Sequence, residues 1–313
     1  VRHRTRGLAR LAHPHRLPLM RRGLIYGTLA YGLWGLFPFF FKQLQHVPSL
    51  QVVLHRMVWS LVFVLLVLAV LRRWAWLGDV RRRPRLLATF AASSALLACN
   101  WLTYIWAVNN GHVLDASLGY FILPLVNVAL GFLFLHERPR PAQWLAFGTA
   151  AAGVLWLALL TGHVPWIALA LAVSFGFYGL IRKLAPLGAL EGMSLETLLL
   201  APVAAAALLW GQHSGALPAQ DAHTWLLFAL SGPVTAVPLL LFSAGARRIP
   251  LSTMGVLQYI TPTILLFLGA LFYGESLTVP RLIGFCLIWA GLLLYSIDGW
   301  HHRRRASAGA GPG

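Results

Sequence analysis

The sequence predicts an all-α polytopic membrane protein with ten transmembrane helices in two inverted five-helix repeats. Three observations lead to this fold class. First, the 313 residues are 58% hydrophobic and 11% charged, with a mean hydropathy of +0.72, whereas soluble domains carry about 25% charged residues. Second, long apolar runs recur along the chain, and Lys and Arg gather in alternate gaps between them. Third, a pattern of glycine and proline in the first half returns in the second half.

The apolar runs define the expected spans. Lipid leaves no backbone group without a partner, so each run is expected to be a helix. A transmembrane β-barrel would need alternating segments of about ten residues, and the sequence has no such pattern. The runs and their breaks place helices at residues 23–41, 51–71, 86–108, 113–135, 142–161, 164–181, 194–211, 223–244, 251–273 and 279–298.

These spans divide the chain into four parts. Residues 1–21 are expected to form a basic, disordered N-terminal tail, and residues 300–313 a basic, glycine-rich tail at the other end. Between them, residues 22–161 form the first predicted repeat and residues 162–299 the second.

The basic residues predict the orientation. All but three of the 25 Lys and Arg residues lie in the N-terminal segment, the C-terminal tail and every second loop, and the exceptions are Lys42, Arg56 and Arg281. By the positive-inside rule, this places both termini on the cytoplasmic side of the inner cell membrane. The net charge of +17 is also compatible with nucleic-acid binding. Because the arginines are short caps between apolar runs, we expect the lipid bilayer, and no nucleic acid, as partner.

Two stretches predict the repeat: LGYFILPLVNVALGFLFLHE at 118–137 and LQYITPTILLFLGALFYGES at 257–276. At an offset of 138 residues, Pro124 aligns with Pro262, Gly131 with Gly269 and Glu137 with Glu275. Five spans separate the copies, and because five is odd the copies cross the membrane in opposite senses. Such inverted repeats are typical of transporters, whose site lies between the halves near mid-membrane. A duplication without a transport role is the alternative.

The matched prolines predict where a cavity lies. Proline cannot donate a backbone hydrogen bond, so it leaves a carbonyl free. Membrane helices tolerate this where protein or a water-filled cavity satisfies the carbonyl. Pro124 and Pro262 are therefore expected to bend spans 4 and 9 beside a central cavity. A packed kink without a ligand is the alternative for either proline.

Helical spacing selects side chains that share a stripe with these prolines or face them. The cavity candidates are Tyr31, Trp34, Asn100, Trp101, Tyr104, Tyr120, Pro124, Asn127, Tyr178, Gln258, Tyr259 and Pro262. Aromatic faces with amides and hydroxyls suit a small-molecule substrate that is neutral or zwitterionic and can carry rings. Core packing or an interfacial belt is an alternative for each aromatic residue. The three amides either contact the substrate or bridge helices.

Four further side chains are candidates for gating or ion pairing. His55 and Arg56 open the second span, and Asp115 opens the fourth on the same face, where it can pair with Arg56. Whether that pair would gate the cavity or act as scaffold is left open. Glu196 is expected near the opposite face, out of reach of His55 but near Arg182 or Lys183.

Five stretches resemble one known family: AYGLWGLFPFFFK (30–42), HVPSLQVVLHRMVWS (46–60), NWLTYIWAVNNGHVLDASLGYFILPLVN (100–127), SFGFYGLIRK (174–183) and VPLLLFSAGARRIPLSTMGVLQYITPT (237–263). From about residue 20 to 300 the chain resembles the RarD proteins, a branch of the EamA part of the drug/metabolite transporter superfamily. The resemblance implies ten helices in two inverted repeats in the cytoplasmic membrane. It does not define the cargo, although members carry a label of chloramphenicol sensitivity. Small multidrug exchangers of the same superfamily carry a glutamate in the first span, and this sequence has no acid there.

Together these features predict a secondary transporter that moves a small metabolite or drug-like molecule by alternating access. The sequence has no phosphate-binding loop, so ATP is not expected to be the direct energy source. No metal or cofactor is expected, because zinc-type motifs, clustered Asp and paired Cys are missing from the spans. A membrane-embedded enzyme or receptor without transport activity is the alternative. Monomer and homodimer both stay open.

Overall fold

The computed structural model describes residues 16–110, 112–160, 162–272 and 278–308, and every regular element in these ranges is helical. The elements are α1 (Arg16–Gly35), α2 (Phe37–Phe41), the 3-10 helix η1 (Lys42–Leu44), α3 (Ser49–Leu71), α4 (Trp76–Arg82), α5 (Pro84–Asn109), α6 (Val113–Leu135), α7 (Pro141–Leu159), α8 (Trp166–Leu184), α9 (Ala189–His213), α10 (Ala222–Ala246), α11 (Leu251–Gln258), α12 (Ile260–Phe272) and α13 (Val279–Ala308).

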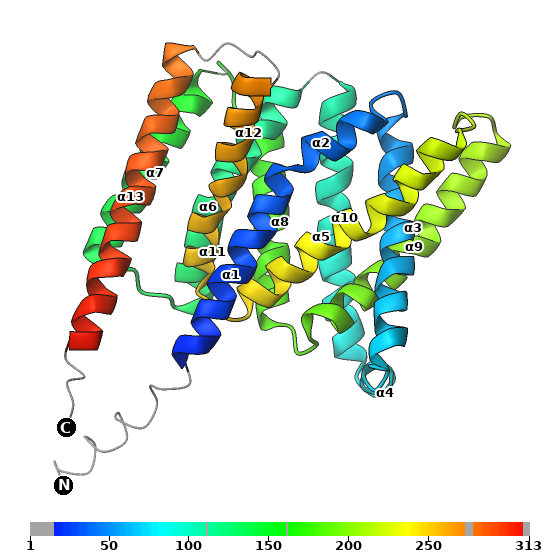
Figure 1. The fold of residues 1–313 in the computed structure, drawn as a ribbon, viewed down its shortest axis with the longest axis horizontal. Helices are drawn as coiled ribbons and strands as arrows, with labels where there is room; N and C mark the ends of the chain where they lie inside the picture. Colours follow the sequence, from blue (N-terminus) through cyan, green and yellow to red (C-terminus); the bar gives the residue numbers. More distant parts are fainter. Residues whose placement is uncertain (1–15, 111, 161, 273–277, 309–313) are drawn as a thin grey trace, which may run out of the picture.

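Ten stretches of the described chain are long and apolar enough to cross a membrane, counting α1 with α2 and η1, and α11 with α12, as single spans. They stand side by side, and the start of α1 and the end of α13 lie at the same side of the molecule (Figure 1). The predicted count of ten spans is confirmed, and the protein is a multi-pass membrane protein.

Both ends of the chain are more helical than the sequence analysis expected. Helix α1 begins at Arg16, so residues 16–21 belong to a helix and not to a tail. Helix α13 continues to Ala308, past the predicted boundary at residue 299. Arg and Ala are strong helix formers, and proline is tolerated in the first turn, where Pro18 lies. Residues 1–15 and 309–313 lie outside the described residues.

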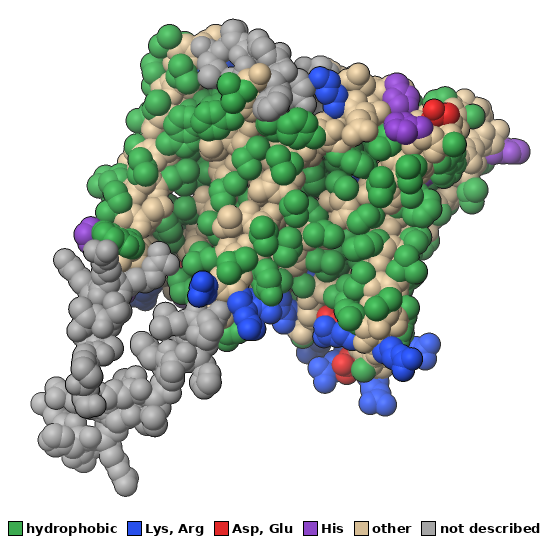
Figure 2. All heavy atoms as spheres, viewed as in Figure 1, with side chains coloured by type: hydrophobic (Ala, Val, Ile, Leu, Met, Phe, Trp, Pro, Cys, Tyr) green, Lys and Arg blue, Asp and Glu red, His purple; other side chains and the backbone are tan. Residues whose placement is uncertain are grey.

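Apolar and charged side chains are distributed over the surface as in a membrane protein. Figure 2 shows a broad apolar band, with Lys and Arg side chains gathered below it. We call this side the basic end; the helix termini there carry Arg72 after α3, Arg81 in α4, Arg140 before α7 and Arg248 after α10. The opposite side, with α2, η1 and the loop between α9 and α10, is called the α2 end. Exposed leucines and aromatic residues such as Leu66 and Trp210 lie on the apolar helix surfaces, as lipid contact requires.

The helix contacts come in matching sets. Helix α1 packs against α10 and α12, and α8 packs against α5 and α6. Helix α3 packs against α9 and α10, while α9 packs against α3 and α5. Helix α7 packs against α13, and α6 against α11. If α1, α3, α5, α6 and α7 correspond to α8, α9, α10, α11–α12 and α13, each contact has a counterpart. This pairing supports the predicted inverted repeat.

Glycines at aligned positions of the two halves, where a neighbouring helix approaches closely, also support the inverted repeat. A Cβ on Gly35 would lie 2.8 Å from Cβ of Ile264, and one on Gly176 would lie 2.7 Å from Cγ1 of Val126. Gly176 is the aligned position of Gly35 at an offset of 141 residues, and Ile264 that of Val126 at 138. Small residues at these crossings let two membrane helices approach closely, so the same contact is built twice.

The two halves nevertheless differ in helix continuity. The first span breaks at Leu36 between α1 and α2, whereas its counterpart α8 is continuous. Helix α6 continues through Pro124, whereas its counterpart breaks at Tyr259 between α11 and α12. Beside Pro262 the span is broken, whereas at Pro124 the helix continues without a break, so a bend of α6 at Pro124 stays a prediction. The Pro124 carbonyl lies against Gly255 of α11, where a Cβ would be 2.6 Å away, so a neighbouring helix supports α6 here.

Pro262 lies in the first turn of α12, three residues after the break. Proline is tolerated there, and its missing N–H removes the helical donor of the Gln258 carbonyl, one residue before the break. A break just upstream is the structural consequence.

Candidate functional site

A cavity of about 510 Å³ lies between the two halves. Its walls come from spans of both halves, and it extends from mid-depth, near Gln258 and Leu265, toward the α2 end at Gln45 and Ser49. Pockets for small molecules occupy about 300–1,000 Å³ and are mostly apolar with a few polar groups. The size and the mixed aromatic and polar lining fit that class.

Six of the predicted cavity residues line it: Trp34, Asn100, Trp101, Tyr104, Tyr120 and Gln258. Tyr120 and Gln258 are aligned positions of the two halves, and each precedes a matched proline by four residues. Because proline has no N–H, the backbone carbonyls of Tyr120 and Gln258 lose their helical donors. Both residues that precede the matched prolines by one helical turn therefore line the cavity, while free carbonyls at these positions stay a prediction.

The other six predicted residues do not line the cavity: Tyr31, Pro124, Asn127, Tyr178, Tyr259 and Pro262. Asn127 is buried and donates to Oε1 of Gln258 at 3.5 Å, so it lies behind the wall. The Tyr259 hydroxyl donates to the Phe121 carbonyl at 3.3 Å. Helical spacing assigns a residue to a face but does not say which neighbouring helix covers that face, and here α11 covers the Pro124 side of α6.

Aromatic rings close the cavity toward the basic end. Trp34 and Phe175, aligned positions of the two halves, both line it, with ring centroids 5.7 Å apart and an interplanar angle of 79°. Tyr31 and Tyr178 lie one layer further from the cavity, with centroids 5.5 Å from Trp34 and 5.3 Å from Phe175. The edge-to-face packing of Trp34 on Phe175 is favourable, and the tyrosine rings lie tilted against this pair. Both tyrosines are therefore support for the cavity floor.

Arg56 of α3 faces the cavity. Its Nε donates to Oγ1 of Thr235 at 2.9 Å, and its guanidinium carbon lies 4.8 Å from the Phe41 ring centroid and 5.4 Å from that of Trp101. These contacts hold the planar group between two aromatic faces, a favourable cation–π arrangement.

The anticipated pair between Arg56 and Asp115 does not form. Asp115, in the first turn of α6, lies 3.3 Å from Nδ1 of His112 and 3.5 Å from Nε2 of His163. Arg56 turns instead toward α10 and its hydroxyl acceptor. The expectation failed because shared depth in the membrane does not bring two side chains onto facing sides of their helices.

His55 points away from the cavity. It is buried against α10, with its ring stacked on Phe228 at a centroid distance of 3.9 Å and edge-on to Trp225 at 5.0 Å. This is a packing environment, and His55 has no ion-pair partner within the described residues.

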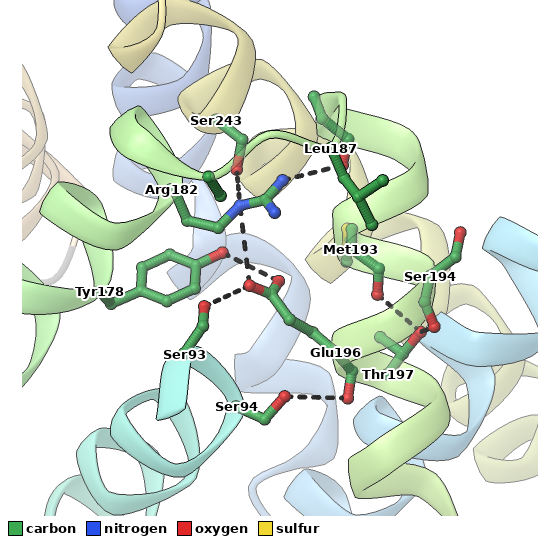
Figure 3. Close-up of polar contacts among 12 residues, drawn as sticks. Ser93, Ser94, Tyr178, Arg182, Leu187, Met193, Ser194, Glu196, Thr197 and Ser243 are labelled. Atoms are coloured by element: carbon green, nitrogen blue, oxygen red, sulfur yellow. Dashed lines mark hydrogen bonds and ion pairs between the residues drawn. The ribbon is translucent and has the colours of Figure 1, made fainter. Parts of the chain in front are cut away.

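A buried polar cluster closes the protein at the basic end (Figure 3). Nε of Arg182 lies 3.7 Å from Oε1 of Glu196, and both side chains are almost fully buried, at 0% and 1% exposure. The same Nε donates to Oγ of Ser243 at 3.0 Å, and the Tyr178 hydroxyl donates to Oε2 of Glu196 at 3.4 Å. Ser93 also donates to Glu196. We call these five residues the Arg182–Glu196 cluster; they join α5, α8, α9 and α10.

Part of this cluster was accessible from sequence. Arg182 was one of two partners expected for Glu196, and the other, Lys183, donates instead to the carbonyls of Ala246 and Ile249 at 2.9 and 2.5 Å. The sequence analysis missed Ser93 and Ser243, because serine inside an apolar run is too common to signal a distant carboxylate or guanidinium.

A surface arginine reinforces the same end. Nη1 of Arg247 donates to the Ala185 carbonyl at 2.6 Å and also to the Leu187 carbonyl, so it anchors the loop between α8 and α9. Partial burial, together with the nearby charges of Arg182 and Arg248, lowers the pKa of Arg247 from its ordinary value. No group of three or more potential metal ligands occurs among the residues that the structure describes.

The sequence model of the EamA-like transporter family matches residues 21–159 and again residues 164–297. The chain belongs to the EamA-like transporter family. An uncharacterised transporter of Pseudomonas aeruginosa is 46% identical over 91% of this chain and 97% of its own. The proteins named RarD of Streptomyces exfoliatus and Escherichia coli K12 are 45% and 42% identical, each over 92% of this chain and over 92% and 98% of theirs. The resemblance to RarD proteins is confirmed.

A solved crystal structure has a fold similar to that of this chain. It matches with a TM-score of 0.67 at 20% identity, over 88% of this chain and 97% of the other. At this identity the likeness concerns the fold alone. The family match and the named relatives, and not this structure, make the chain a membrane transporter of the EamA-like family.

Proposed function

We propose that this EamA-like protein is a secondary transporter that moves a small molecule across the cytoplasmic membrane by alternating access, with both termini in the cytoplasm. One observation carries the proposal. The cavity between the halves extends toward one end, while the other end is closed by an aromatic floor and the Arg182–Glu196 cluster. A carrier in one of its two access states has this arrangement.

The differences between the aligned helices support the alternation. The first half is bent at Leu36 where the cavity extends, and the aligned helix α8 is straight where the protein is closed. If the first half took the straight conformation and the second half the bent one, the cavity would extend toward the basic end. Arg182 aligns with Phe41 and Tyr178 with Phe37 at an offset of 141. In the exchanged state, Phe37 and Phe41 would take the closing role at the α2 end.

Cysteine accessibility tests this proposal. Cys99 and Cys286 are first replaced by Ala, and a single cysteine is then introduced at Ser49 on the cavity wall or at Thr197, the buried position aligned with Arg56. Replacing Glu196 by Gln weakens the closed end. Reagent applied at the α2 end should then label Ser49→Cys more slowly, while reagent at the basic end labels Thr197→Cys faster.

The matched control is Glu191→Gln, because Glu191 pairs at the protein edge with the exposed Arg73. It should leave both labelling rates near those of the parent. Labelling that rises at both positions after Glu196→Gln would indicate loosening of the fold and contradict alternation. In parallel, the purified chain in proteoliposomes should exchange a bound solute without ATP.

A further inference from the structure

We infer that the cargo carries a carboxylate that binds the guanidinium of Arg56. This inference rests on the transport function proposed above and names the chemical class of its substrate: a small organic acid or zwitterion with an apolar, ring-sized body. It keeps the zwitterionic cargo expected from sequence, adds organic acids and drops neutral molecules, because a neutral cargo would leave the charge of Arg56 without a partner.

The charge of Arg56 on the cavity wall calls for an anionic partner. Among the described residues that line the cavity, Arg56 alone is ionised at neutral pH, and no Asp or Glu faces it there. The salt bridges among the described residues do not include Arg56. A cation at membrane depth is costly unless it is paired or faces water, and such residues mark substrate pathways. A cargo anion would supply the pair.

The contacts of the Arg56 guanidinium leave one edge for the cargo. Nε of Arg56 donates a hydrogen bond to Thr235, and the rings of Phe41 and Trp101 cover the guanidinium. Within the described chain, the bond from Nε to Thr235 is the hydrogen bond that the Arg56 side chain makes, so its terminal nitrogens are left for the cargo. The remaining N–H edge is planar and carries parallel donors, which match the two oxygens of a carboxylate. Tyr104 and Tyr120 also line the cavity and bring hydroxyl groups to the same wall.

A carboxylate also matches both the charge and the apolar surface of the cavity wall. A phosphate carries about −1.5 to −2 charges at pH 7 and would exceed the one cation of the wall, whereas a carboxylate matches it. Apolar side chains such as Phe37, Leu123 and Leu265 line the same cavity and suit an apolar body. A carboxylate bearing one ring or a comparable apolar group therefore fits both parts of the lining.

The test compares an acid with its amide. Binding of 3-phenylpropanoate and 3-phenylpropanamide to the purified full chain is measured by thermal stabilisation across a concentration series at pH 7. A charge-assisted hydrogen bond contributes enough for about a 10- to 150-fold difference in affinity. We expect the acid to bind at least about tenfold more tightly than the amide.

Variants identify the side chain responsible. Arg56→Met should reduce the acid-to-amide preference to about one. Lys42→Met removes the same charge from η1, near the same end but outside the cavity wall, and should keep the preference. If Arg56→Met does not fold, Arg56→Lys keeps the charge without the planar fork and should keep a smaller preference.

Three results would overturn the inference: equal binding of acid and amide to the wild type, no stabilisation by the acid, or an unchanged preference in Arg56→Met. Flux in proteoliposomes separates this outcome from failure of the proposed function. Arg56-dependent acid binding without acid flux would leave the carboxylate site standing and reject transport. Flux of the amide that ignores Arg56 would support transport and reject the carboxylate.

Discussion

Arg182 and Glu196 show how much a single buried contact decides at the residue scale. Neither side chain reaches solvent, and their pairing distance of 3.7 Å is complemented by hydroxyl donors and acceptors on three other residues. Buried ion pairs often add little net stability compared with apolar replacements, but removing one partner leaves an uncompensated charge. The cluster is thus sensitive to single changes, as the proposed alternation of access would require of the closed end.

We predict that Arg182→Met lowers the free energy of unfolding by about 3–5 kcal/mol, because Glu196 then stays buried without its cation. The double variant Arg182→Met/Glu196→Met should recover most of this loss. Thermal melting of the purified protein measures both effects. Arg73→Met is the control: Arg73 is 59% exposed in its pair with Glu191, and loss of such a pair costs about 0–1 kcal/mol. Equal losses in Arg182→Met and Arg73→Met would contradict the prediction.

The amides of the cavity wall give a second prediction. Asn100 donates to the Leu171 carbonyl at 2.9 Å and to Oγ of Ser174 at 3.0 Å, so it bridges α5 and α8. Gln258 accepts one long bond, at 3.5 Å, from Asn127. Asn100→Leu should therefore lower the melting temperature more than Gln258→Leu.

Either substitution should weaken cargo binding by about 5- to 150-fold where the amide bonds the cargo directly, since a polar group left without a partner costs about 1–3 kcal/mol. Transport in proteoliposomes, measured beside melting temperature, separates the two roles. Wild-type transport by both variants would mean that the cargo binds elsewhere.

At the scale of elements, glycines determine how closely α7 and α13 pack. A Cβ on Gly291 would lie 2.6 Å from the Ala146 carbonyl oxygen, and one on Gly153 would lie 2.7 Å from that of Gly284. Gly153 and Gly291 are aligned positions of the two halves. Backbone atoms cannot move aside as side chains do, so the helices must separate if either glycine gains a methyl group.

We predict that Gly291→Ala destabilises the protein by about 1–3 kcal/mol through overpacking. Gly148→Ala is the matched control in the same helix pair, because nothing lies within 4 Å of a Cβ at Gly148. Replacing an open helical glycine should be neutral or stabilising by up to about 1 kcal/mol. Chemical denaturation in detergent compares the two variants, and similar stabilities would argue against close α7–α13 packing.

For the whole molecule, the distribution of arginine predicts the orientation. Asp79 is exposed in α4 at the basic end, and Ser214 is exposed in the loop after α9 at the α2 end. After Cys99 and Cys286 are replaced, we predict that a membrane-impermeant thiol reagent labels Ser214→Cys in intact cells. Asp79→Cys should react only after the membrane is permeabilised. The reverse pattern would place the basic end outside the cell.

The sequence by itself determined the class, the number of spans and six residues of the cavity wall. Apolar length and the exclusion of unpaired backbone from lipid make ten helices the natural solution. The residues before the matched prolines, Tyr120 and Gln258, could be placed beside a cavity because a missing N–H has a local, predictable effect. Family membership followed from long motifs such as residues 100–127, which are local strings as well.

The tertiary structure alone decided which faces meet. It turned Arg56 into the cavity and toward Thr235, gave Asp115 two histidine neighbours, and buried Tyr31 and Tyr178 beneath the floor. It also brought Ser93 to Glu196 across 103 residues of chain. A helix has one periodicity, whatever packs against it, so its sequence indicates faces and depth. The partner of each face depends on crossings set by small residues throughout the chain, and these become defined only when all ten spans pack together.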